Sequence, residues 1–264
     1  MNANAGESPA PGPDAGQSIL TPGDQIAAIT AHSAGFAAAA DGHLDADVPS
    51  CPGWTVADLA GHLTEVHWFW ATIAAERLAE PPPGSRRPAT APRGQLLAAF
   101  RAGADRLAEV LRTADGTAPV WTWAPQRDIA FIRRHQVQEA AVHHWDAVSA
   151  AGGRLAIEPP VAADSVEEFL TFSVPTLAAY PEPARPALAG QFGLRATDTG
   201  SAWTVRDDQL PGTVRYDRGA PPDLPAVTGT ASDLLLWLYG RVTLDTGGVP
   251  AALLDRFRAL TETD

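Results

Sequence analysis

The sequence contains no lysine, since all 19 of its basic residues are arginine. Chemistry that needs a lysine amine is therefore excluded, including a Schiff base with pyridoxal phosphate and a Walker A phosphate loop. The single cysteine, Cys51, excludes an internal disulfide framework and zinc sites that need several cysteines. No run of 18 apolar residues is present, so we expect no membrane-spanning helix and no membrane partner.

Acidic residues are more numerous than basic ones, 31 against 19, and the net charge is −12. This balance, without a basic stripe, argues against a nucleic-acid partner. Residues 1–18 are rich in Gly, Pro, Ser and Ala and lack the basic and apolar regions of a signal peptide. We expect residues 1–18 to be a disordered tail and the protein to be cytoplasmic.

The first part of the chain carries four helical patterns. Val56, Leu59, Leu63, Val66 and Trp70 recur at intervals of three and four residues after the T-x-x-D pair that begins at residue 55. A proline-rich stretch at 80–94 separates this helix from the next. The expected helices are 23–40, 56–79, 95–113 and 127–150, and we predict that residues 19–153 form a four-helix bundle.

The pattern changes after residue 153. A fifth helix at 161–178 is followed by short strand-like runs with turn signals between them, and two helices close the chain. The expected strands are 192–197, 202–205, 213–216 and 225–229, and the closing helices are 232–241 and 249–260. The fold class is therefore predicted as α+β, with the bundle followed by a small α+β domain at 154–264.

One stripe of the fourth predicted helix combines an acid, an imidazole and a second acid. Glu139, His143 and Asp146 are spaced by four and three residues, which stacks them on one side of a helix. His62 lies beside the apolar positions of the second helix. Two imidazoles and a carboxylate from facing helices are the ligand set of a catalytic zinc site, and Asp146 would orient an imidazole.

Spacing alone leaves other interpretations open. A Glu and a His one turn apart also occur on solvated helices, and the same ligands suit ferrous iron. His67 and His144 fall off the proposed face and are expected to be surface or packing residues. His135, one turn before Glu139, could reach the same face. Cys51 is expected to pack structurally in its turn. Trp54 is expected to staple the start of the second helix, with lining of the pocket as the alternative.

Three motifs carry a resemblance to a known family. They are VPSCPGWTVADLAGHLTEV (48–66), RRHQVQEAAVHHWDA (133–147) and GTASDLLLWLYGR (229–241). In this order they resemble the mycothiol-dependent maleylpyruvate isomerase family, which belongs to the DinB-like superfamily of metal-dependent helical bundles. The resemblance covers nearly everything after residue 20 and implies a DinB-like bundle at the N-terminal end.

Carried over onto this sequence, the resemblance implies that His62, Glu139 and His143 bind zinc. Asp146 takes the place of the family's downstream aspartate, and Arg241 that of an arginine that handles an anionic substrate. Arg241 could instead cap a helix or pair with a carboxylate such as Asp233.

The implied function is that of a zinc enzyme with mycothiol as thiol co-substrate. Zinc lowers the pKa of a bound thiol, and the thiolate adds to a cis-enedione such as maleylpyruvate, which then isomerises. Two alternatives stay open: a mycothiol S-transferase that conjugates an electrophile, and a non-catalytic module that binds a metal or ligand. The sequence fits either a monomer or a homodimer and does not identify the substrate.

Overall fold

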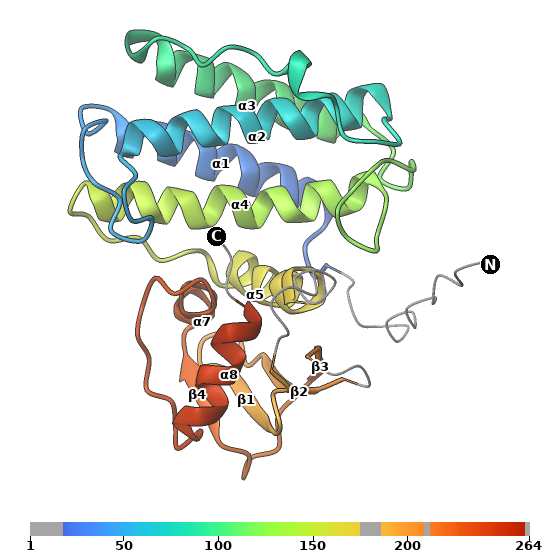
Figure 1. Ribbon diagram of the computed structural model, residues 1–264, viewed down its shortest axis with the longest axis vertical. Coiled ribbons are helices and arrows are strands. Elements are labelled where there is room, and N and C mark those ends of the chain that lie inside the picture. Colours follow the sequence, from blue (N-terminus) through green and yellow to red (C-terminus); the bar gives the residue numbers. More distant parts are fainter. Residues whose placement is uncertain (1–17, 175–185, 209–211, 262–264) are drawn as a thin grey trace.

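The computed structural model describes residues 18–174, 186–208 and 212–261 (Figure 1). Helices stacked side by side form one part of the molecule, and a sheet with further helices forms the other. The predicted α+β fold with two domains is therefore confirmed. The predicted tail lies outside the described residues apart from Ser18, as do residues 175–178 of the predicted fifth helix.

Each of the four predicted helices of the N-terminal part is present. α1 packs along α4 and α3, and α2 packs along α3. α1 and α2 each begin at a capping box, in which a threonine hydroxyl accepts a backbone N–H three residues on and an aspartate accepts the threonine's own N–H. These boxes are Thr21 with Asp24, and Thr55 with Asp58. The helices are α1 (Pro22–Ala40), α2 (Val56–Glu76), α3 (Leu96–Thr113) and α4 (Ile129–Ala150).

The second helix ends earlier than predicted, at Glu76 instead of residue 79. Arg77 adopts the left-handed conformation, with φ 52°, and its N–H bonds to the carbonyl of Ile73. The prolines at 81–83 then keep the chain from resuming the helix. Two short 3₁₀ turns, Gly84–Arg86 and Arg93–Gln95, occupy the connection to α3.

The C-terminal part contains a four-stranded mixed sheet. Its order is β3-β2-β1-β4, with β1 antiparallel to β2 and parallel to β4. A π-helical turn, Phe169–Ser173, continues the fifth helix. The elements are α5 (Pro159–Glu168), β1 (Gln191–Ala196), β2 (Ala202–Asp207), β3 (Val214–Arg218), β4 (Ala226–Gly229), α7 (Ala231–Leu238) and α8 (Ala251–Thr261).

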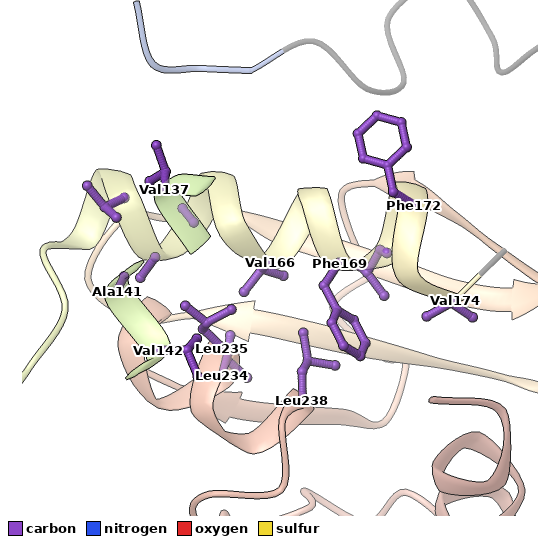
Figure 2. Close-up of a cluster of buried hydrophobic side chains, with 14 of the residues drawn as sticks. Val137, Ala141, Val142, Val166, Phe169, Phe172, Val174, Leu234, Leu235 and Leu238 are labelled. Carbon is purple, nitrogen blue, oxygen red and sulfur yellow. The ribbon is translucent and has the colours of Figure 1, made fainter. Parts of the chain in front are cut away.

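One hydrophobic core joins the two parts. Val137 and Val142 of α4 meet Val166 of α5, Phe169 of the π-helical turn and Leu235 of α7, all buried (Figure 2). Burial of each such side chain contributes about 1.5–3 kcal/mol. Because α1 covers one side of α4 and α5 covers another, α4 is buried along most of its length and is held rigidly.

Buried charges tie the same elements together. Arg134 on α4 donates from Nε to Oδ2 of Asp164 on α5 over 3.1 Å, and both side chains are almost fully buried. Glu167, also on α5, accepts from Arg218 of β3 and from the indole of Trp203 in β2. Removing either partner of the buried Arg134–Asp164 pair would leave an uncompensated charge, so this contact helps to fix how α5 packs between bundle and sheet.

His67 is a packing residue of the bundle, one of the two roles expected for it. It is 2% exposed, packs against Phe100 at 5.2 Å between ring centres, and lies against Gly103. Its Nδ1 has no hydrogen-bond partner in the described part of the chain. Burial lowers the pKa of His67 to about 4, so its imidazole is neutral in the folded protein at pH 7.

Acidification is therefore expected to destabilise the fold through His67. Between pH 6.5 and 4 the unfolded chain protonates this histidine and the folded chain does not, so stability falls as the pH falls through that window. The free energy of unfolding is expected to be about 2 kcal/mol lower at pH 5 than at pH 7 because of this histidine. Urea unfolding at both pH values should show a smaller loss for His67→Phe than for the wild type. Equal losses of stability in the variant and the wild type would contradict the role given to His67. His43→Gln, at an exposed position, is the control and should behave as the wild type does.

No helix in the described ranges combines the length and the hydropathy that a membrane crossing requires.

Candidate metal centre

The chemistry-bearing side chains of α4 lie along one stripe of the helix. The stripe contains His135, Gln138, Glu139, Val142 and His143, which recur at intervals of three and four residues and all line one pocket. Asp128 caps the start of α4, because its carboxylate accepts the backbone N–H of Phe131. The rigid helix therefore presents these side chains together to α2, which supplies His62.

His62, Glu139 and His143 converge, as the sequence predicted. Nε2 of His62 lies 3.2 Å and Nε2 of His143 lies 3.6 Å from Oε1 of Glu139. One potential ligand atom from each residue lies within 4.8 Å of the others. Two imidazole nitrogens and one carboxylate oxygen, open to a pocket, form a donor set that fits zinc with a free coordination position.

Glu139 carries a charge suited to holding a cation. Burial alone would raise the pKa of Glu139, but the hydrogen bond with His62 and the charges of His143 and His135 outweigh it and hold the pKa far below its usual range. The carboxyl group is therefore ionised throughout the neutral range, as a metal ligand must be.

Asp146 fixes the orientation of His143. It is fully buried, and its Oδ2 lies 2.9 Å from Nδ1 of His143. Arg241 and Ser50 also donate to this carboxylate, Ser50 over 2.5 Å. Burial alone would raise the pKa of Asp146, but His143 and Arg241 lower it to about 2. An ionised Asp146 accepts the proton on Nδ1, so Nε2 of His143, which faces Glu139, is the ring nitrogen available to a metal ion.

Arg241 reaches the pocket from the C-terminal domain. Its Nη2 lies 3.0 Å from Oδ2 of Asp146 and 3.8 Å from Sγ of Cys51, and its Nη1 donates to the carbonyl of Tyr239. The alternative partner considered from the sequence, Asp233, instead closes the capping box at the start of α7. The guanidinium is thus held by Asp146 and only 11% exposed.

The pocket has a volume of about 590 Å³ and extends beyond the three converging residues. Cys51 and Trp54 of the C-P-G-W turn and Trp123 line it. Burial and the charge of Asp146 raise the pKa of the Cys51 thiol, which disfavours a nucleophilic role. Trp54 also lines the pocket, which was the alternative position for it; it is 38% exposed and contacts His62 of α2 edge-on.

Two histidines outside the converging group differ in their surroundings. His144 is half-buried beside His32, with 3.1 Å between their Nδ1 atoms, away from the pocket. His135 lines the pocket, but among the described residues it does not join the group of converging atoms. Its Nδ1 lies 3.0 Å from Oε1 of buried Glu168 on α5, a partner that the sequence did not suggest. Only its position one turn before Glu139 indicated that it would lie in the site.

Comparisons with known proteins cover both parts of the chain. Residues 26–148 match the model of the mycothiol maleylpyruvate isomerase N-terminal domain, and residues 160–256 match that of the C-terminal domain of the same family. No relative among curated proteins matches the sequence.

Two solved structures share the fold. One is a crystal structure of a mycothiol-dependent maleylpyruvate isomerase, 14% identical, with a TM-score of 0.60. The other is that of a mutant of such an enzyme in which one histidine is replaced by alanine, 13% identical, with a TM-score of 0.57. Each alignment covers 88% of this chain and 95% of the other. With both domains matched in order, the chain belongs to the mycothiol maleylpyruvate isomerase family.

Proposed function

We propose that the chain is a metal-dependent enzyme that uses mycothiol to isomerise a small, anionic cis-enedione of the maleylpyruvate type. The observation that carries this proposal is the convergence of His62, Glu139 and His143 on one side of an open pocket, in a member of this family. The related solved structures are described as mycothiol-dependent maleylpyruvate isomerases, which supports the choice of thiol and substrate class. The proposal includes a cytoplasmic location.

The residues that would hold the metal are His62 and His143 through Nε2, and Glu139 through a carboxylate oxygen. A zinc ion there would supply a positive charge that lowers the pKa of a thiol, so that a thiolate is present near neutral pH. Asp146 keeps the proton of His143 on Nδ1, and Arg241 keeps Asp146 ionised. Trp54 and Trp123 contribute apolar surface to the pocket wall.

The proposed reaction begins when the thiol sulfur forms a bond to one alkene carbon of the enedione. The π electrons of the double bond move onto the adjacent carbonyl as an enolate, and the former double bond becomes a single bond. After rotation about that bond, the enolate collapses, the carbon–sulfur bond breaks and the trans alkene forms. The thiol is regenerated, so no other reactant is consumed.

A second candidate function is transfer of the thiol to an electrophile. The contact between Arg241 and Asp146 favours it, because a guanidinium already paired with a buried carboxylate is less available to bind a substrate carboxylate. An S-transferase would share the first bond-forming step, and protonation of the enolate at carbon would then give a stable thioether.

Product analysis separates the two candidates. With zinc-loaded protein, mycothiol and maleylpyruvate, we expect the trans isomer to accumulate and the thiol concentration to stay constant. Loss of one thiol per substrate, with a thioether detected by mass spectrometry, would replace isomerisation by transfer. If neither product forms, with zinc bound and several electrophiles offered, the protein is a binding module and the proposed activity is wrong.

A further inference from the structure

The pocket has a second polar end, one helical turn from the converging residues. His135 lines it, with its imidazole stacked on Phe131 at an interplanar angle of 8° and in edge contact with Trp123 at 5.1 Å. Nδ1 is held by Glu168, which is fully buried. The ring is thus fixed on both sides, while its Nε2 has no hydrogen-bond partner in the part of the chain that the structure describes.

His135 is suited to donate a hydrogen bond to a ligand. Burial alone would lower the pKa of its imidazole, but the hydrogen bond and the charge of Glu168 outweigh it and raise the pKa above the ordinary value. When the ring is protonated, it donates from Nδ1 to Glu168, and the second N–H, on Nε2, is left for another acceptor.

Gln138 provides a second unpartnered group beside His135. It is 3% exposed, lines the same pocket, and its buried Oε1 has no partner among the described residues. Three residues separate it from His135, so the two side chains are neighbours on the surface of α4. The NH₂ group of this amide can donate to an oxygen acceptor such as a carboxylate, whereas its Oε1 needs a donor.

The third observation concerns the charges of the pocket. The guanidinium of Arg241 also lines the pocket, but Asp146 already occupies it. We propose that His135 and Gln138 form the carboxylate-binding subsite, where the anionic end of the electrophile docks while its alkene faces the thiol beside His62 and His143. This subsite deepens the proposed function and rests on it for the identity of the ligand.

Charge-assisted hydrogen bonds from an imidazole and an added amide donor fit a carboxylate better than a neutral group. Glu168 then acts as a positioning residue, since it holds the imidazole and is too deeply buried to contact the ligand. In this proposal the negative charge of the substrate is bound by His135 and Gln138 on α4, and not by Arg241.

Calorimetric titration with maleate, a simple cis-dicarboxylate, tests the subsite on the zinc-loaded protein. We expect saturable binding, weakened about tenfold or more in His135→Gln and in Gln138→Leu, with unchanged zinc content and a retained fold. His43→Gln, at an exposed position outside the pocket, is the matched control and should bind as the wild type does. Gln138→Leu keeps the histidine in place, so the test does not depend on one variant folding.

Repeating the titration on metal-free protein separates the subsite from the metal. If the wild type fails to take up zinc, the proposed function is wrong, but maleate binding that both variants lose still supports the subsite. Wild-type affinity in both variants, or no maleate binding to the wild type in either form, would overturn the subsite. The metal content of the same samples, measured by mass spectrometry, shows whether each binding result was obtained with or without zinc.

Discussion

Replacing His143 with alanine is expected to remove the metal and to lower thiol-dependent turnover by about three orders of magnitude or more. The imidazole is one of the three groups that converge in the pocket, and a metal's charge stabilisation of a reaction is worth several kcal/mol. Metal content by mass spectrometry and turnover with mycothiol should fall together. His62→Ala is expected to behave in the same way.

Two companion variants keep this result interpretable. Glu139→Gln preserves the shape of the side chain but removes its charge, so it should weaken metal binding while the fold persists. His43→Ala changes an exposed histidine outside the pocket and should leave both metal and turnover unchanged. Stoichiometric zinc in His143→Ala would show that the converging residues are a buried polar network and not a metal site.

Asp146→Asn is expected to destabilise the protein by about 3–5 kcal/mol, measured by urea unfolding of the metal-free form. The change leaves Arg241 as a nearly buried charge without its counterion. The same variant should bind zinc about 10–100-fold more weakly, because His143 loses the carboxylate that fixes its Nδ1 proton.

The double variant Asp146→Asn with Arg241→Met, compared with the two single variants, completes a double-mutant cycle for this ion pair. Because it removes both charges together, its destabilisation should be smaller than the sum of the two single changes, by about 0.5–3 kcal/mol. Additive losses would show that the ion pair does not couple the two domains energetically. Zinc affinity should remain low in the double variant, since the introduced methionine side chain offers His143 no acceptor in place of the lost carboxylate.

Much of the candidate site could be predicted from local spacing. Glu139, His143 and Asp146 lie on one stripe because the helical period fixes their relation, and the capping box at Thr55 fixed the start of α2 and hence the side on which His62 emerges. The helices and strands were predicted to within a few residues because the residues that end them, such as proline, glycine and capping residues, are visible in the local sequence. The end of α2 was missed since no breaker separates Glu76 from the prolines that follow.

Contacts between distant segments could not be predicted in the same way. Asp146 and Arg241 are 95 residues apart, and His135 and Glu168 are 33 apart. Both pairs depend on how the C-terminal domain docks against α4, which no periodicity encodes. The position of Trp54 stayed open between two alternatives for a related reason: its exposure depends on the shape of the turn and on the pocket in front of it, not on its neighbours in sequence.

The core shared by α4, α5 and α7 has a consequence for cooperativity. Opening α4 would expose the side chains that it buries against the C-terminal domain, so neither half can unfold without disrupting the other. Amide protons along α4 should therefore exchange with solvent only through global unfolding, and a single transition is expected on heating. Glu139 and His143 are thus anchored in the part of the molecule that we expect to exchange most slowly.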